Sequence, residues 1–593
     1  MLAIEALNLQ KSFGKTKALD DLSLQVKKGT IHAILGPNGS GKTTFLKVCT
    51  TLLKPDAGTV RIAGHDSVLE EKKVRGMISV TGQSTSIDEE MTGSENLYLV
   101  ARLMGYDRSG ARQRVRDLLL FFGLANAGNA LVKNYSGGMR RRLDLAASIT
   151  RVPEILFLDE PTIGLDPRSR NGLWSVIRNL TRLDTTVLLT TQHLEEANQL
   201  ADRITVIDLG KVISEGTSEE LKASLGTKSL HINIRDASLN LDSLLEGVEF
   251  FVNRTGEDGR EISVPVRDQN HAIGLLCKLR EQEINIGSFN MSGPGLDEVF
   301  LALTGNKTKE DDTPDDGISM TGGGESFLGG SDRILTTPPV KHTGILTHKL
   351  MFGWRNLLKI KHVPEQFVDV LITPVMFTFL FTYLFGGVVA GSPAEYLQFL
   401  IPGIMVQTLA FNSAYSGINI HTDITKGIFD RFRTMPIWPP SPLVGIFIGD
   451  FFKYLISGLI VLLFGYILGF RAEAGFLGYA VSFLIMIAFA MSISWIFIIM
   501  GLTMRSTSAV MSIGWLLLTP IVFMSNIYVD PLTMPGWLQA FISWNPLSWQ
   551  VDAVRGLLLG DPSLKEILHA LGGSLIISLI LSPVAFLLYK KER

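Results

Sequence analysis

The stretch GPNGSGKTT, residues 36–44, places the strongest constraint on the fold of this 593-residue sequence. It follows the apolar segment Ile31–Leu35, which is expected to form a buried strand, and a run of helical character comes after it. The stretch fits the pattern G-x-x-x-x-G-K-[ST], in which glycines let the backbone wrap closely around phosphate groups. The strand–turn–helix context therefore predicts a phosphate-binding loop.

The residue types in this loop indicate a nucleoside triphosphate with a metal ion. Lys42 is expected to bring a positive charge to the β- and γ-phosphates, and Thr43 to offer its hydroxyl to Mg²⁺. The predicted phosphate-binding residues are Gly36, Pro37, Asn38, Gly39, Ser40, Gly41, Lys42, Thr43 and Thr44.

Two further buried strands end in polar side chains. ILFLDEP (residues 155–161) presents Asp159, a candidate Mg²⁺ ligand, and Glu160, which could orient and deprotonate the attacking water. VLLTTQHLEEA (residues 187–197) ends at His193, which is placed to reach a γ-phosphate. Because the carboxyl ends of parallel strands line one ligand crevice, these groups are expected to lie together.

The stretch YSGGM (residues 135–139) predicts a helix that begins at an N-cap, Ser136, and is followed by Gly137 and Gly138. A helix N-terminus with bare N–H groups attracts anions. No nucleophile, base or metal ligand stands beside it in the sequence, so the anion must be brought by another group.

The ordered set GPNGSGKTT, SVTGQ, YSGGM, ILFLDEP, GLDP and TTQH resembles the nucleotide-binding domain of ABC transporters, over residues 1 to about 215. The resemblance implies ATP and Mg²⁺ as cofactors. It also implies two ATPase domains that dimerise head to tail, with each ATP between the phosphate loop of one copy and the SGG helix of the other. The anion expected at the YSGGM helix is then the γ-phosphate of an ATP held by a second copy of the chain.

The same resemblance assigns roles to single residues. Ser136 and Gly138 are expected to contact the γ-phosphate in trans, and Phe13 to stack on adenine. Gln83 is expected to act in catalysis, to reach Mg²⁺ and to link the metal with the membrane domain. Asp166 is expected at the dimer seam.

The second half of the chain contains long runs without charged residues. A helix that crosses about 30 Å of hydrocarbon needs roughly 20 apolar residues. Six spans are predicted, at residues 370–394, 396–422, about 443–469, 474–504, 506–529 and 567–589. The segment Pro531–Val551, rich in Pro and Trp, is interpreted as a re-entrant or surface-lying hairpin on the outer side, with an ordinary span as the alternative.

The distribution of charges predicts the orientation in the membrane. The start MLAIEALNLQKSFGK lacks the pattern of a signal peptide, and the basic loop KGIFDRFRTMPI (residues 426–437) and tail KKER favour the cytoplasmic side. We therefore expect a multi-pass plasma-membrane protein with the ATPase domain and both termini in the cytoplasm. Residues 343–362 are expected to form an amphipathic helix along the inner leaflet.

The predicted fold class is multidomain. An α/β P-loop ATPase domain occupies residues 1–216, and a small α+β module with a ferredoxin-like pattern occupies residues 217–305. An acidic, glycine-rich flexible linker follows at 306–342, and an all-α, six-span transmembrane domain at 343–593. LDEVFLALTG (residues 296–305) and VTGQSTSIDEEMTGSENL are similar to ATPase subunits of daunorubicin-resistance exporters. The membrane half looks like a type V exporter domain.

The sequence does not decide the role of two charged clusters. Arg140, Arg141 and Arg142 are interpreted as a solvated or coupling face rather than a phosphate site. Asp450 and Lys453, three residues apart on one helix, could pair at the cytoplasmic end of a span or contact a substrate.

The sequence favours an ATP-driven exporter that works as a homodimer and moves lipophilic or amphipathic cargo, such as drugs or lipids, across the lipid bilayer. The alternative is an ATP-driven mechanical or sensing device without transport. The net charge of −2 argues against nucleic acid as a partner.

Overall fold

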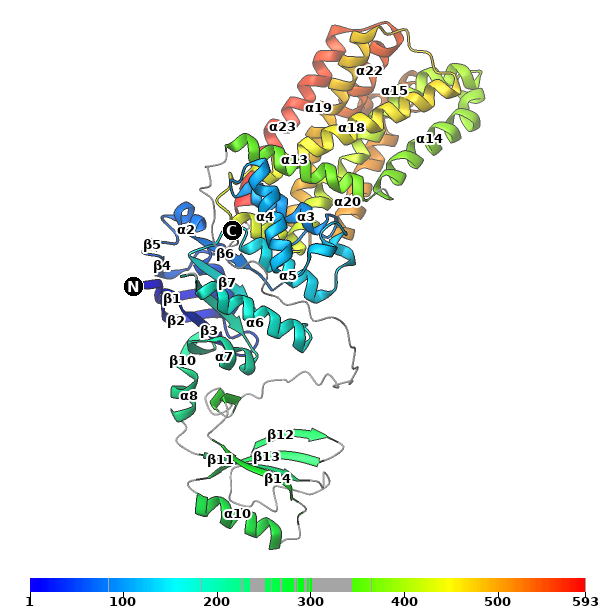
Figure 1. The fold of residues 1–593 in the computed structure, drawn as a ribbon. Helices are drawn as coiled ribbons and strands as arrows, with labels where there is room; N and C mark the ends of the chain where they lie inside the picture. The colour runs from blue at the N-terminus through cyan, green and yellow to red at the C-terminus, as the bar shows by residue number, and fades with distance from the viewer. Residues whose placement is uncertain are drawn as a thin grey trace. The chain divides into compact units, whose positions relative to one another are not determined.

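The computed structural model describes the whole chain apart from residues 84, 183, 225–227, 235–250, 257–258, 267–268, 282–283, 285, 293–295, 298, 301–343, 364 and 592–593. It divides into two compact units, residues 1–83 with 152–328 and residues 84–151 with 329–593 (Figure 1). The predicted flexible linker at 306–342 lies outside the described residues.

A six-stranded sheet forms the centre of the first unit. Its strands, in spatial order, are β10 (Lys211–Gly216), β9 (Arg203–Asp208), β3 (Ile31–Leu35), β8 (Thr186–Thr191), β7 (Ile155–Asp159) and β6 (Ile78–Thr81). All neighbours run parallel except β9 and β10. Every residue of β3, β7 and β8 is buried, as expected for strands covered on both faces. Their carboxyl ends therefore share one edge of the sheet.

A second, antiparallel sheet packs against the first. Its order is β2 (Thr16–Lys27), β1 (Leu2–Phe13), β4 (Ala57–Ile62) and β5 (His65–Asp66). One hydrophobic core joins the two sheets and includes Ile4, Leu22, Ile34, Phe45 and Phe157. The helices of this unit are α1 (Lys42–Cys49), α2 (Glu71–Met77), α6 (Pro167–Thr181), α7 (Leu194–Leu200) and α8 (Ser218–Ser224).

The small module contains an antiparallel sheet with the order β12 (Phe251–Gly256), β13 (Gly259–Val266), β11 (Lys228–Ile234) and β14 (Ile286–Ser292). Helix α10 (Gln269–Glu281) connects β13 and β14. Alternate strand residues such as Ile232 and Val264 share a buried cluster with Leu275 and Leu279 of α10.

The second unit begins with three helices, α3 (Gly93–Leu103), α4 (Arg108–Phe121) and α5 (Gly137–Ser148), and two short 3₁₀ turns, η1 (Ala125–Ala127) and η2 (Val132–Asn134). Thr92 and Glu95 form a reciprocal capping box at the start of α3. Figure 1 shows α13 (Ile345–His362) beside α3, and the two helices are in contact.

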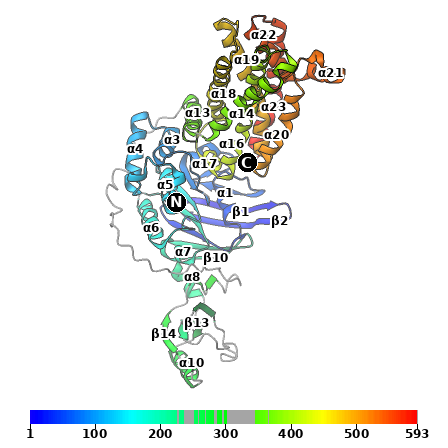
Figure 2. The same cartoon turned by 90° about the vertical axis from the view of Figure 1, so that its right-hand side faces the viewer.

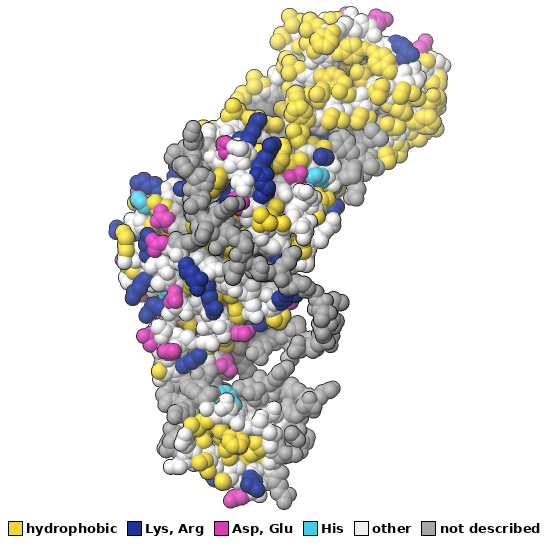
Figure 3. Space-filling view, viewed as in Figure 1, with side chains coloured by type: hydrophobic (Ala, Val, Ile, Leu, Met, Phe, Trp, Pro, Cys, Tyr) yellow, Lys and Arg dark blue, Asp and Glu magenta, His cyan; other side chains and the backbone are white. Residues whose placement is uncertain are grey.

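The apolar helices follow α13 in the second unit. They are α14 (Glu365–Val389), α15 (Pro393–Asn412), α16 (Ala414–Thr425), α17 (Ile428–Thr434), α18 (Ser441–Leu468), α19 (Phe476–Thr503), α20 (Thr507–Phe523), η3 (Pro531–Thr533), α21 (Gly536–Trp544), α22 (Pro546–Leu559) and α23 (Leu564–Lys591). In the space-filling view of Figure 3, hydrophobic side chains cover the surface over α14, α15 and α18.

Five segments of the described chain, rather than the predicted six, are long and apolar enough to cross a membrane: residues 372–389, 393–425, 441–468, 476–503 and 564–590. The predicted span at 506–529 is only the 17-residue helix α20, which ends at Phe523, three residues after Pro520, whose nitrogen cannot donate a hydrogen bond. Residues 531–551 are divided between η3, α21 and the start of α22, and Figure 2 shows α21 apart from the long helices.

Helices α16 and α19 approach each other closely through two glycines. A Cβ atom on Gly417 would overlap the carbonyl oxygen of Phe497, and one on Gly501 would overlap the carbonyl oxygen of Gly417. Small residues at these positions allow the two backbones to touch.

Candidate functional site

The phosphate loop between β3 and α1 has a backbone that requires glycine. Gly39 and Gly41 have φ values of 83° and 105°, in the left-handed region that residues with a Cβ rarely adopt. A Cβ on Gly41 would also overlap the carbonyl oxygen of Ala18. The Nζ of Lys42 donates to the carbonyl oxygens of Gly36 and Pro37, at 2.7 and 2.9 Å. The sequence prediction of a strand, a tight loop and a helix is confirmed.

Lys42 is buried, and its burial lowers the pKa of the ammonium group. Its Nζ lies 4.0 Å from Oε1 of Glu160, the residue that follows β7. The strand ends therefore bring together a cation and a carboxylate that are 118 positions apart in the sequence, since 160 minus 42 is 118. This is the arrangement that the three strand-end motifs predicted.

Asp159 occupies the last position of β7 and contacts two hydroxyl groups. Thr43 donates to its Oδ1 at 3.3 Å, and Thr190 of the neighbouring strand β8 donates to the same oxygen. A carboxylate and a threonine hydroxyl are hard oxygen ligands of the kind that Mg²⁺ prefers. In the described part of the chain no group of three or more His, Cys, Asp or Glu residues could hold a metal ion, so protein oxygens of other types and phosphate oxygens would have to complete such a site.

Glu160 is buried and has a φ of 48°, an uncommon value for a residue with a side chain. Its amide N–H donates to the carbonyl oxygen of Thr190 at 3.0 Å, and its Oε2 accepts from Nε2 of Gln83 at 3.1 Å. Burial raises the pKa of Glu160, and the negative charge of the neighbouring Asp159 raises it further. Three other groups lower this pKa: Lys42, His193 and Gln83. The strained backbone holds the carboxylate inside the site.

Gln83 and His193 complete this cluster. The backbone N–H of His193, at the N-terminus of α7, donates to the hydroxyl of Thr191 at 2.9 Å, and the imidazole is close enough to influence Glu160. Phe13, at the end of β1, is 52% exposed, so its ring is open to stack against a planar group. The structure thus assembles the phosphate loop, Gln83, Asp159, Glu160 and His193 within one unit.

Ser136, Gly137, Gly138 and Asp166 were predicted to face a second copy of the chain. Ser136 caps α5 by accepting from the N–H of Met139 at 3.3 Å, and it is exposed. Asp166 caps α6 by accepting from the N–H of Ser169 at 3.1 Å. The caps agree with the expected helix starts, and the contacts in trans stay a prediction.

The arginines after YSGGM, predicted as a solvated or coupling face, each contact other groups of the second unit. Arg140 makes an ion pair with Glu89 at 3.0 Å and donates to the carbonyl oxygen of Lys133. Arg141 is buried and lies 3.7 Å from the carboxylate of Asp144. Arg142 donates to the carbonyl oxygen of Phe122 at 3.1 Å.

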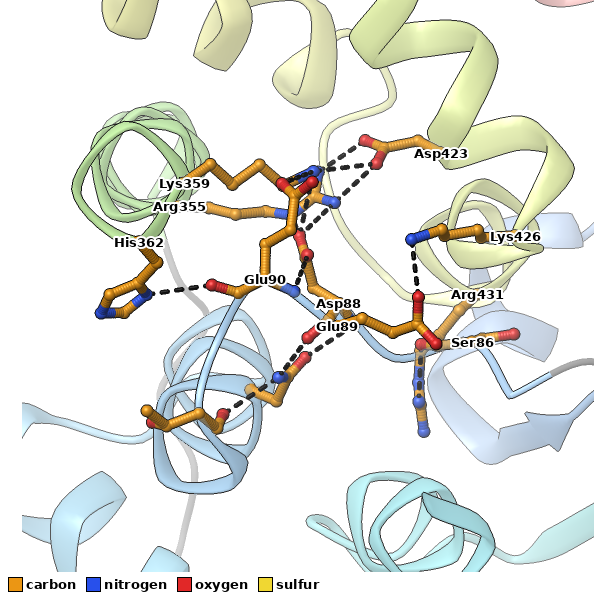
Figure 4. Close-up of polar contacts among 12 residues, drawn as sticks. Ser86, Asp88, Glu89, Glu90, Arg355, Lys359, His362, Asp423, Lys426 and Arg431 are labelled. Carbon is orange, nitrogen blue, oxygen red and sulfur yellow. Dashed lines mark hydrogen bonds and ion pairs between the residues drawn. The ribbon is translucent and has the colours of Figure 1, made fainter. Parts of the chain in front are cut away.

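A buried ion-pair network in the second unit was not among the features predicted from the sequence (Figure 4). Arg355 of α13 is central to it. Its guanidinium donates to the carboxylate of Asp423 at 2.6 and 2.7 Å and to Asp88 at 2.8 Å. Lys359, one turn further along α13, lies 3.1 Å from Asp88 and 3.2 Å from Asp423. Burial works to raise the pKa of Asp88, but Lys359 and Arg355 together hold that pKa below its usual value.

Two other contacts join residues 86–90 and α5 to the loop around α17. Lys426 pairs with Glu89 at 2.7 Å. Arg431 donates to Oδ1 of Asp144 at 2.7 Å, to the Asp144 carbonyl oxygen at 2.9 Å and to the carbonyl oxygen of Ser86 at 3.1 Å. Burial raises the pKa of Asp144, and Arg431 opposes this rise. The basic loop 426–437 therefore contacts both the segment that follows Gln83 in the sequence and the YSGGM helix.

Asp450 and Lys453 are both buried and do not form an ion pair with each other in the described chain. Asp450 accepts from the hydroxyl of Ser416 at 2.6 Å, and the Nζ of Lys453 lies 3.7 Å from the ring centre of Tyr415. Both side chains thus bind α16 instead of forming the predicted pair.

The fold and the site define a P-loop ATPase joined to a helical membrane domain. Residues 19–163 match the family described as ABC transporter, and residues 350–559 match the family described as ABC-2 type transporter. The chain belongs to the ABC transporter family. It is a multi-pass membrane protein, an ABC-2 type transporter whose ABC ATPase domain and membrane domain occur in one chain.

Curated relatives match each half. The chain is 48% identical over 313 residues to the daunorubicin/doxorubicin resistance ATP-binding protein DrrA of Streptomyces peucetius, covering 52% of this chain and 95% of the relative. It is 39% identical over 257 residues to the daunorubicin resistance ABC transporter permease protein DrrB1 of Streptomyces coeruleorubidus, covering 43% of this chain and 89% of the relative. The chain is thus related to drug-resistance exporters.

Among solved structures, one similar chain is an ATP-binding cassette in a dimeric post-hydrolysis state bound to ADP and Pi. It shares 26% identity and a TM-score of 0.34, covering 36% of this chain and 98% of that chain.

Proposed function

We propose that the protein is an ATP-driven exporter that works as a homodimer and moves lipophilic or amphipathic cargo, such as drugs or lipids, outward across the plasma membrane. The names of the relatives, which are drug-resistance proteins, support this cargo class. The chain carries both an ATPase domain and a membrane domain, so one type of polypeptide could supply a whole transporter.

In the proposed reaction, Lys42 binds the β- and γ-phosphates and Glu160 takes a proton from the attacking water. Gln83, which already contacts Glu160, would hold the carboxylate in position. Asp159 and Thr43 fit the hard-oxygen chemistry of Mg²⁺, with Gln83 as a further ligand. When bound, Mg²⁺ would neutralise charge on the phosphates. Ser136 and Gly138 of the second copy would close the site over the γ-phosphate.

The observation that carries the proposal of coupled transport is the network in Figure 4. Asp88 and Glu89 follow Gln83 closely in the sequence, and they bind Arg355, Lys359 and Lys426 on the membrane side. Buried ion pairs with several hydrogen bonds have defined geometry, so a shift of residues 86–90 would be transmitted to α13 and α17. Nucleotide chemistry and helix movement would then be linked mechanically.

The short helix α20 belongs to the proposed topology as a sixth, incomplete crossing. Its 17 residues rise only about 25 Å, somewhat less than a hydrocarbon core. The segment that follows it, including α21, would complete the outer side as a re-entrant hairpin. An even number of crossings keeps both termini on the cytoplasmic side. The sheet order of residues 228–292 supports a ferredoxin-like module.

Transport by the full-length chain in proteoliposomes tests this proposal. ATP added outside should drive uptake of daunorubicin, followed by its fluorescence, into vesicles whose ATPase domains face outward. Glu160→Gln should bind ATP and accumulate no drug. ATP turnover without movement of any compound in a lipid and drug panel would instead support the mechanical or sensing alternative.

A further inference from the structure

Strand β1 continues beyond the end of its neighbour β4. The pairing of these two strands ends at Gln10 and Ala57, and Ala57 is the first residue of β4. Lys11, Ser12 and Phe13 lie beyond this pair, where their backbones pair with β2. The segment that carries the Phe13 ring therefore extends past β4, and it needs further contacts on that side to hold it in place.

Asp56, the residue before β4, supplies these contacts. Its N–H donates to the carbonyl oxygen of Gln10 at 2.8 Å. Its Oδ2 accepts from the N–H of Ser12 at 2.8 Å, and its Oδ1 accepts from Nζ of Lys11 at 2.7 Å. A carboxylate that accepts from a backbone N–H makes a charge-assisted hydrogen bond, which is stronger than a neutral one. Asp56 thus holds the three residues that come directly before Phe13.

The close approach of β4 to β1 fixes the place of Asp56. Gly58, two residues further on, has a φ of 86°, and a Cβ atom there would overlap the carbonyl oxygen of Asn8. Glycine allows the two backbones to approach this closely. The register of the pair shifts between Leu7 and Gln10, so β1 is irregular at the same place. The start of β4 is therefore held against β1, and Asp56 with it.

Lys11 connects Asp56 with the ring of Phe13. The side chain of Lys11 is only 14% exposed, and its Nζ lies 5.9 Å from the centroid of that ring. A cation at this distance over an aromatic face is attracted by the electrons of the ring. Lys11 and the N–H of Ser12 hold the pKa of Asp56 below its usual value, so the carboxylate is charged at neutral pH. The ring is thus linked to Asp56 through the backbone and through an ammonium group.

We propose that Asp56 is a positioning residue of the nucleotide site, which sets the place of the Phe13 ring through Ser12 and Lys11 and thereby controls the affinity for the base of ATP. This inference rests on the predicted stacking of Phe13 on adenine, and it assigns the residues that prepare the ring for that contact. A residue that only held the sheet together would change stability, or would affect a nucleotide and a bare triphosphate alike.

Binding of two probes to the full-length chain in nanodiscs separates the base from the phosphates. The probes are MgATP and magnesium tripolyphosphate, which has three phosphates and no base, and calorimetry measures both affinities. Every chain carries Glu160→Gln to prevent turnover. Asp56→Ala should weaken ATP binding about three- to tenfold, the effect of one net hydrogen bond. The affinity for tripolyphosphate should not change, because the contacts of Asp56 hold the segment that carries the ring.

Two milder variants divide the effect between the two oxygens of Asp56. Asp56→Asn keeps an oxygen that can accept from the N–H of Ser12 but removes the charge that holds Lys11. Lys11→Met removes the cation and leaves the carboxylate. Each should weaken ATP binding less than Asp56→Ala does. In a chain that carries Phe13→Ala, Asp56→Ala should add no further loss, because no ring is left to position.

Asp66→Ala is the matched control. Asp66 also accepts from backbone N–H groups, those of Val68 and Leu69 at 2.8 and 2.9 Å, but it belongs to β5 at the far edge of the same sheet from β2. Its loss should leave the affinities for both probes unchanged. Thermal unfolding identifies the variants that fold, and if Asp56→Ala does not fold, Asp56→Asn and Lys11→Met carry the test.

Equal weakening of the two probes by the Asp56 variants would overturn the inference. So would unchanged ATP affinity in folded Asp56→Ala, or a further loss of ATP affinity when Asp56→Ala is added to Phe13→Ala. If Phe13→Ala itself weakens ATP no more than tripolyphosphate, the predicted stacking is wrong and this inference falls with it. Failed drug uptake by a chain that shows the expected binding pattern would count against export alone.

Discussion

The guanidinium of Arg431 and the carboxylate of Asp144 lie 2.7 Å apart and are both almost completely buried. Arg431 belongs to α17 in the basic loop between the apolar helices, and Asp144 belongs to the helix that Ser136 caps. The predicted phosphate-binding end of α5 and a membrane-domain loop are therefore attached to the same rigid helix.

Removal of one partner of this pair should destabilise the protein strongly. Arg431→Met leaves Asp144 buried without its main counter-charge, at a cost of about 3–5 kcal/mol. Adding Asp144→Asn to the same chain should recover part of the loss, because the carboxylate that lost Arg431 is then replaced by a neutral amide, although buried Arg141 loses its contact with that carboxylate. Thermal unfolding in nanodiscs measures both. A double variant less stable than Arg431→Met would contradict the ion-pair explanation.

The pH dependence of hydrolysis should report the environment of Glu160. Burial raises the pKa of this carboxylate above its usual value of 4.5. As the proposed base, Glu160 must be ionised, so ATP turnover should fall as the pH drops through the raised pKa. Gln83 opposes the rise by hydrogen bonding, and Gln83→Leu should therefore move the acidic limb to higher pH.

The measurement is the turnover rate at saturating ATP between pH 5 and 8, chosen as the usual range of maximal stability. Nucleotide binding over the same range serves as the control for titration of ATP itself. An acidic limb that moves to lower pH in Gln83→Leu would show that the contact between Gln83 and Glu160 does not set this pKa.

Sharing of ATP sites between two copies predicts complementation. Lys42→Ala chains and Ser136→Arg chains should each fail to trap nucleotide alone. When they are mixed, random pairing makes half of the dimers hybrid, and each hybrid has one intact site, so about a quarter of wild-type trapping should return. The matched control mixes Lys42→Ala with a chain that carries both substitutions. Trapping no higher than this control would exclude sites made in trans.

Close packing of α16 against α19 predicts a steric effect at Gly501. Gly501→Ala should lower stability by about 1–3 kcal/mol, because the added methyl group would overlap the backbone of Gly417. Gly572→Ala in α23 is the control, since a Cβ there meets nothing within 4 Å. Unfolding temperatures in detergent compare the two variants. Equal effects would mean that helix propensity, rather than space, controls the outcome.

The sequence predicted the parts of the ATPase that depend on local pattern. Strands β3, β7 and β8 appear where apolar runs end at Gly36, Asp159 and His193, because the strand, its turn and its polar end are contiguous in the chain. The loop glycines were predictable for the same reason, since their backbone conformation follows from residue type.

The membrane interface could not be predicted in this way. Arg355 is 68 residues from Asp423 and 267 from Asp88, and Arg431 is 287 residues from Asp144. Tertiary packing decides which charged residues pair over such separations. The sequence contains many other charged residues, so the partners of Arg355 and Arg431 cannot be identified from it. The available signal was the presence of Asp423 directly after an uncharged run, which marks a charge that needs a buried partner.

The helix lengths were also beyond the sequence pattern. Hydropathy alone extends 506–529 to a full span, whereas Pro520 and the turn after Phe523 shorten the helix to α20.

The hydrogen bonds and ion pairs that join residues 86–90 and α5 to the loop helices involve charged side chains, and this has a consequence for gene architecture. When two surfaces are joined by ion pairs, each of them can be exposed to water without the aggregation that follows exposure of an apolar surface. A cassette encoded as its own polypeptide, ending after β10, should stay in solution and reassemble with separately made membrane helices. Fusion into one reading frame then fixes the ratio of the two parts at one to one, and gene fission would sacrifice that ratio while leaving assembly possible.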